Sequence, residues 1–154
     1  MLRRVVLLGG ALLIGVMLLG GVALAKDIRG TFGKDNLKGT NQLDRIYGLG
    51  AKDTIMGLGG NDDCYGGSGF DAIRCGAGDD RIDGGFGVDQ LFGGPGNDRI
   101  LAADGRVDRV NCGTGDDTAY IDPDDVVEPA ENKICEHIFV ATEQTGAYSG
   151  THKD

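Results

Sequence analysis

The middle of the chain repeats a nine-residue unit. From Gly57 to Leu101 the sequence reads GLGGNDDCY, GGSGFDAIR, CGAGDDRID, GGFGVDQLF and GGPGNDRIL, which are five copies of G-G-x-G-x-D-x-U-x, where U is usually a large apolar residue. A fixed period of this kind is typical of solenoid folds, in which every copy adds the same piece of structure. The repeat therefore constrains the fold more than any other feature of the sequence.

Aspartates continue with the same period on both sides of this stretch. The aspartate occupies the sixth position of each copy, and a mostly apolar position follows it two residues later. One residue is inserted within 102–106, after which the aspartates resume one position late. The series is Asp35, Asp44, Asp53, Asp62, Asp71, Asp80, Asp89, Asp98, Asp108 and Asp117.

Each copy combines a glycine-rich loop with a three-residue strand whose middle side chain points inward. Because so short a strand buries no core alone, neighbouring copies must stack on one another. Two copies, with two strands and eighteen residues, would form one coil of such a stack. We predict an all-β fold, a parallel β-roll (a right-handed β-solenoid) of about five two-strand turns over residues 26–120. Its two interior columns would be Ile28, Ile46, Cys64, Ile82, Ile100 and Ala119, facing Leu37, Ile55, Ile73, Leu91 and Val110.

The repeats from Ile28 to Ala119 resemble the RTX, or haemolysin-type, calcium-binding nonapeptide family. The resemblance implies a β-roll that holds several Ca²⁺ ions between loops one coil apart, bound by backbone carbonyls and sixth-position carboxylates. Hard oxygen ligands suit Ca²⁺ better than softer metals. The implied metal-binding residues are Gly57, Gly59, Asp62, Gly66, Ser68, Asp71, Gly76, Gly78, Asp80, Gly85, Gly87, Asp89, Gly94, Gly96, Asp98 and Asp117.

Not every pair of loops matches the family pattern equally well. The best expected ligand pairs are Asp62 with Asp80, Asp71 with Asp89, and Asp80 with Asp98. Sites at Asp44 and Asp53 stay open, because Gln42 and Ala51 replace the fourth-position glycine of their loops. The insertion puts later sites in doubt, because it separates Asp89 from Asp108, and Asp98 from Asp117, by nineteen residues.

Calcium is expected to control folding of this chain. The interior columns give only a thin hydrophobic core, and stacked carboxylates about 4.8 Å apart repel one another unless a cation lies between them. We therefore expect ion binding and folding to be one coupled equilibrium.

The four cysteines predict two disulfides in a secreted chain. Cys75 and Cys112 each open a repeat, two coils or about 9.6 Å apart, which is too far for a bridge, and Cys64 lies farther still from Cys112. Elimination leaves Cys64 with Cys75, and Cys112 with Cys135.

The two ends of the chain differ from the repeats. Residues 1–25 have the arginines, the apolar run from Val5 and the A-x-A ending at Ala25 that are typical of a secretory signal peptide. We expect cleavage after Ala25; an uncleaved membrane anchor is the alternative. A C-terminal cap is expected over 121–140 and a disordered tail over 141–154.

The composition narrows the functional classes. A formal net charge of −9 disfavours nucleic acid as a partner. No G-x-S-x-G, H-E-x-x-H or phosphate-cradling GK[ST] motif occurs, and the repeats leave no room for a catalytic domain, so we expect no enzyme. The prediction is a secreted, monomeric calcium-binding protein.

The alternative is a cell-surface structural or adhesive module that uses calcium only as a scaffold. The eighteen-residue spacing places Tyr47, Tyr65, Leu101 and Tyr120 on one outer face, beside Arg45, Arg81 and Arg99. That face would bind a glycan or another protein.

Overall fold

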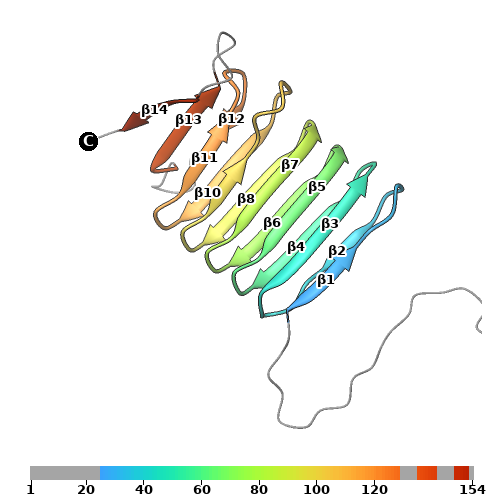
Figure 1. Ribbon diagram of the computed structural model, residues 1–154. Helices are drawn as coiled ribbons and strands as arrows, with labels where there is room; N and C mark the ends of the chain where they lie inside the picture. Colours follow the sequence, from blue (N-terminus) through green and yellow to red (C-terminus); the bar gives the residue numbers. More distant parts are fainter. Residues whose placement is uncertain (1–24, 129–134, 142–147, 153–154) are drawn as a thin grey trace, which may run out of the picture.

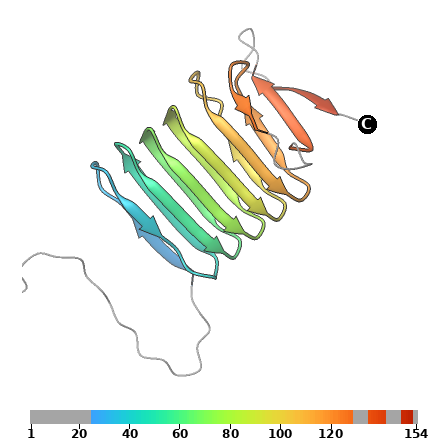
Figure 2. The same cartoon turned by 180° about the vertical axis from the view of Figure 1, so that it is seen from behind.

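The computed structural model describes residues 25–128, 135–141 and 148–152, and within them it contains strands, turns and bends but no helix. The strands form two sheets that stack in sequence order along the molecule (Figures 1 and 2). The first sheet, in spatial order, is β1 (Lys26–Arg29), β3 (Asp44–Gly50), β5 (Asp63–Gly69), β7 (Arg81–Gly87), β9 (Arg99–Leu101), β11 (Thr118–Ile121), β13 (His137–Ala141) and β14 (Tyr148–His152). The second is β2 (Asn36–Lys38), β4 (Thr54–Gly59), β6 (Ala72–Ala77), β8 (Gln90–Pro95), β10 (Arg109–Thr114) and β12 (Val126–Val127).

Strands β1 to β13 alternate between the sheets, and all pairings except that of β13 with β14, which share the first sheet, are parallel. The predicted parallel β-solenoid is thus confirmed, with one correction to its length. The second sheet has six strands, so there are about six turns instead of about five. The expected cap supplies the difference, because its residues Val126 and Val127 pair with Arg109 and Val110 and continue the coil.

The eighteen-residue register builds the predicted interior. Ile46 pairs with Cys64, and Cys64 pairs with Ile82, while Ile55 and Ile73 pair in the other sheet. These five side chains are fully buried. Both expected columns are present, with Ile28 only partly buried at the open first coil.

The inserted residue leaves this stacking unchanged. Thr118 pairs with Arg99, and Arg109 with Gln90, each across nineteen residues. The extra residue is accommodated in the loop between β9 and β10, where Gly105 has φ +85° and open space around it. The insertion therefore widens one loop without shifting the sheets.

Both predicted disulfides are present. Cys64 is bonded to Cys75, with Cα atoms 6.4 Å apart, and joins the two sheets within one coil. Cys112 of β10 is bonded to Cys135, with Cα atoms 5.4 Å apart, and holds the segment just before β13 against β10.

The end of the chain is more ordered than expected. Within the stretch predicted to be a disordered tail, Tyr148–His152 form β14, which pairs antiparallel with β13. Without it, β13 would present an open row of main-chain N–H and C=O groups, and an added strand satisfies them. Residues 142–147 and 153–154 lie outside the described part.

The predicted signal peptide also lies almost wholly outside the described residues. In the part that the structure describes, no helix has the length and apolar character needed to cross a membrane.

Candidate metal centre in the aspartate columns

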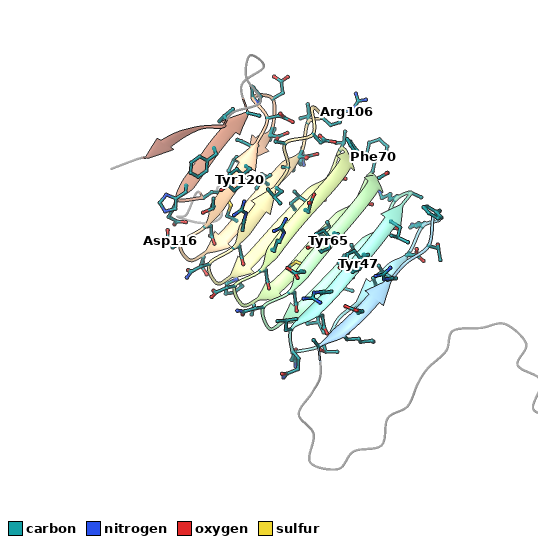
Figure 3. All side chains as sticks on the ribbon, viewed as in Figure 1. Tyr47, Tyr65, Phe70, Arg106, Asp116 and Tyr120 are labelled. Carbon is teal, nitrogen blue, oxygen red and sulfur yellow. A yellow bond between two sulfur atoms is a disulfide. The ribbon has the colours of Figure 1, made fainter. Side chains whose placement is uncertain are left out.

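The repeat aspartates lie at the junctions between loops and strands, in two rows along opposite edges of the solenoid. Phe70 marks one edge and Asp116 the other (Figure 3). Although ionisable, the carboxylates are almost inaccessible, with exposed fractions of 0–3%. The buried members are Asp44, Asp53, Asp62, Asp71, Asp80, Asp89, Asp98, Asp108 and Asp117. Burying a carboxylate is costly unless it is hydrogen-bonded and its charge is compensated.

One oxygen of each buried carboxylate is hydrogen-bonded to the preceding coil. The main-chain N–H of Asp62 donates to Oδ1 of Asp80 over 2.7 Å, and Asp71 donates to Asp89 over 2.8 Å. The series therefore forms two columns in which each carboxylate supports the backbone of the coil before it.

The same contact survives the insertion. Asp89 N–H donates to Asp108 Oδ1 and Asp98 N–H to Asp117 Oδ1, each over 2.8 Å. The nineteen-residue spacing therefore leaves the column hydrogen bonds intact, because the extra residue is taken up in the loop and the strands stay aligned.

The second oxygen of most of these carboxylates has no hydrogen-bond donor among the described residues. These buried Oδ2 atoms belong to Asp53, Asp62, Asp71, Asp80, Asp89, Asp98 and Asp108. A buried charged acceptor without a partner is rare and needs an explanation such as an ion.

A main-chain carbonyl lies near the same oxygen. A Cβ built on Gly66 would lie 2.6 Å from Asp71 Oδ2 and closer still to the carbonyl oxygen of Gly84, which is in the next coil. The same pair of oxygens surrounds Gly57, where the atoms are Asp62 Oδ2 and the carbonyl oxygen of Cys75. Two oxygen acceptors thus converge on the space that the missing side chain of each of these glycines leaves open.

Six of the seven loops that contain these unpaired oxygens share one backbone conformation; the exception is the enlarged loop before Asp108, whose second residue, Ala103, has no positive φ. In the six loops the second residue has positive φ, whether it is glycine, as in Gly67 (+105°), or leucine, as in Leu49 (+82°) and Leu58 (+88°). Ala51 also takes φ +70° in place of the usual glycine, so the loop before Asp53 keeps this conformation. We call these the open loops.

A family model described as RTX calcium-binding nonapeptide repeat (4 copies) matches residues 29–64 and again residues 65–100. The chain carries RTX calcium-binding repeats. Searches of curated proteins and of solved structures returned no match. The RTX match and the unpaired oxygens agree, because the matched residues include most of the open loops.

Electrostatics in the RTX columns also favours a bound cation. Desolvation by burial raises the pKa of the column carboxyls. The hydrogen bond from the preceding coil lowers this pKa, and the charge of the neighbouring aspartate raises it further. The pKa rises to about 6 at Asp62, about 7 at Asp80, Asp89 and Asp98, and about 8 at Asp108, and it is also raised at Asp53, Asp71 and Asp125. A cation nearby would stabilise the ionised form against this penalty.

The side chains of the described residues do not by themselves form a metal cage. Among the described residues, no three His, Cys, Asp or Glu side chains gather in one place. An ion in an RTX column must therefore rely on main-chain carbonyl oxygens together with the carboxylates, which is a donor set that suits Ca²⁺.

Two column residues were missed by the sequence analysis. Asp108 N–H donates to Asp125 Oδ1 over 2.8 Å, and Asp117 N–H donates to Glu136 Oε2 over 3.0 Å. They continue the columns past the recognised repeats at spacings of seventeen and nineteen residues. A search that tolerated one residue on either side of eighteen, and accepted glutamate, would have found them.

Proposed function

We propose that this is a secreted calcium-binding protein whose solenoid orders as Ca²⁺ enters the aspartate columns. The observation that carries the proposal is the buried Oδ2 atom of the open loops, which has no donor among the described residues. At Asp53, Asp62, Asp71 and Asp98 this oxygen and a carbonyl oxygen of the next coil both lie beside the first glycine of the loop. The RTX repeat supports calcium as the ion.

The proposed ligands are the sixth-position carboxylates and the carbonyls of the glycine-rich loops. The glycines contribute through their backbone and through the absence of a side chain, so the proposed roles of Gly57 and Gly66 rest on the space next to Asp62 and Asp71. Asp117 is included because it accepts the same column hydrogen bond as the others.

Coupling of binding to folding is supported by the position of the charges. Each carboxylate is buried only when the coils stack, and stacking brings it near the carboxylate of the neighbouring coil, which raises its pKa. Folding without cations therefore brings like-charged carboxylates together, which is unfavourable. A cation that binds between coils is bound only in the stacked state and so stabilises it.

Secretion is supported by the segment before Ala25 and by the two disulfides, which are typical of oxidising compartments. Outside the cell calcium is abundant, so the chain would cross the membrane unfolded and order afterwards. We propose a binding role with no catalysis.

The deciding experiment combines calorimetry with circular dichroism on the mature chain. We expect Ca²⁺ to bind with a stoichiometry of several ions and strand content to appear over the same concentration range. Equal strand content with chelator and with millimolar Ca²⁺ would refute the coupling, and the absence of binding heat and of a calcium-induced spectral change would refute the function.

A second candidate function is adhesion through the outer face of the first sheet. There Tyr47 and Tyr65 stack with ring centroids 4.9 Å apart, and Arg29 lies 5.1 Å from the centre of the Tyr47 ring. Further along the same sheet lies Tyr120 (Figure 3). Its ring stacks on that of Phe139, with the centroids 5.1 Å apart. Flat aromatic rings with guanidinium groups beside them suit sugars.

The adhesive role is tested by glycan-array binding of the calcium-loaded protein. Tyr65→Ala should abolish a signal that Phe92→Ala preserves, since Phe92 pairs with Arg74 on the opposite sheet at 4.6 Å. Equal binding by both variants would argue against this face.

A further inference from the structure

The first two loops of the solenoid differ from all the open loops. They read GTFGKD (30–35) and GTNQLD (39–44), with threonine in the second position. Neither Thr31 nor Thr40 has positive φ. Threonine is β-branched and tolerates the left-handed region poorly, so this residue type favours the other conformation.

In these loops threonine supplies the donors that the open loops lack. The N–H of Thr40 donates to Asp44 Oδ2 over 2.5 Å, and its hydroxyl donates to the same oxygen over 2.9 Å. Thr31 makes the matching contacts with Asp35 Oδ2, over 2.6 Å and 3.0 Å. Asp35 and Asp44 are thus absent from the carboxylates whose Oδ2 is buried without a donor.

The threonine donors bind the same carboxylate oxygen that the proposed cation would bind in the open loops. A Cβ built on Gly39 would lie 2.7 Å from Asp44 Oδ2 and 2.5 Å from the carbonyl oxygen of Gly57, the same two kinds of oxygen that surround Gly66. In loop 39–44 the carboxylate oxygen already has two donors, so little is gained from an ion.

We propose that Thr31 and Thr40 replace the cation in the first loop of each row, so that the ion sites of this solenoid begin at Asp53 and Asp62. The inference rests on the proposed calcium binding and specifies where it starts. It gives the first of the described coils carboxylates whose oxygens are hydrogen-bonded by the chain itself.

The proposal predicts a gain of function from restoring the repeat pattern. The double variant Thr40→Gly/Gln42→Gly turns GTNQLD into a loop with glycine in the second and fourth positions. We expect calorimetry to show one more Ca²⁺ per chain than in the wild type. Thr40→Ser, which keeps both donors, should leave the stoichiometry unchanged.

A second pair of variants keeps the test decisive if the double variant does not fold. Asp44→Asn should bind as many ions as the wild type, whereas Asp62→Asn should lose one. An unchanged stoichiometry in a folded double variant, or the loss of one ion in Asp44→Asn, would overturn the proposal. If the wild type itself binds no calcium, the proposed function fails as well, and the two failures are thereby distinguished.

Discussion

The main-chain N–H of Asp98 donates a 2.8 Å hydrogen bond to Oδ1 of Asp117, although the chain between them is one residue longer than the repeat requires. The contact matches that between Asp62 and Asp80, where the spacing is regular. The column geometry therefore depends on strand register and tolerates loops of different length.

Removing one column carboxylate should remove one bound ion. Asp80→Asn keeps the shape of the side chain and an acceptor for the N–H of Asp62, but it deletes the charge. We expect calorimetry to show one Ca²⁺ fewer and the midpoint of calcium-induced folding to rise. Asp27→Asn, on the exposed face of β1, is the control and should behave as the wild type. Equal losses in both would point to net charge as the cause.

Without calcium, the folded state should become less stable as the pH rises. The folded-state pKa values of about 7 at Asp80, Asp89 and Asp98 exceed the ordinary value of 3.8, so between these limits the folded chain holds more protons than the unfolded chain. That stability is fully present below about pH 4 and is lost as the pH rises through 7.

Circular dichroism in chelator from pH 5 to 8.5 measures this loss of stability. With calcium we expect the folded state to become more stable as the pH rises, because protons compete with the ion for the same oxygens. We expect the Ca²⁺ affinity to rise with pH up to about 8, where Asp108 titrates. An affinity that does not change with pH would show that these carboxylates are not ligands.

Filling the space beside a carboxylate should displace the ion. Gly66→Ala would place a methyl group 2.6 Å from Asp71 Oδ2 and against the Gly84 carbonyl, so we expect loss of an ion and a clear loss of stability. Gly105→Ala is the control, because no atom lies within 4 Å of its Cβ position and only the strain of φ +85° acts there, costing about 1 kcal/mol. Denaturation should show the larger loss of stability in Gly66→Ala, and calorimetry should show the loss of an ion in that variant alone.

Relieving a strained loop should stabilise the protein. Leu58 has φ +88° and is 40% exposed, so Leu58→Gly removes strain and loses little burial. We expect a gain of about 1 kcal/mol in the calcium-bound state. Leu43→Gly, at a similarly exposed position without positive φ, should be destabilising. If both changes destabilise, the strain is absent.

The second disulfide should fix the end of the solenoid. Replacing Cys112 and Cys135 by serine removes a link across 23 residues, which should lower the free energy of unfolding by about 3 kcal/mol. Limited proteolysis in calcium should then cut the variant between β12 and β13 while the earlier coils persist. If the variant resists proteolysis as well as the wild type, the pairing of β13 with β11 is sufficient to hold the end of the solenoid.

The nine-residue period was enough to predict the interior, the columns and the disulfides, because side-chain direction and coil spacing follow from it directly. It could not predict β14, since antiparallel pairing at an edge leaves no repeat in the sequence. Asp125 and Glu136 escaped because their spacings depart from eighteen by one residue.

The repeat pattern also did not predict that threonine satisfies the carboxylates of the first two loops. The aspartate of GTNQLD is in register, and the N–H and hydroxyl of Thr40 decide whether its carboxylate is paired within the chain. The fourth position was a poor guide as well, because Ala51 adopts the left-handed conformation that glycine usually provides there.

The stacking of β1 to β13 joins each strand only to those one coil before and after it. Growth or shortening by whole coils would thus change the length of the molecule by about 4.8 Å per eighteen residues and leave its cross-section the same. Selection or design could therefore adjust the length of the molecule and the number of proposed ion sites together, by adding or removing whole coils.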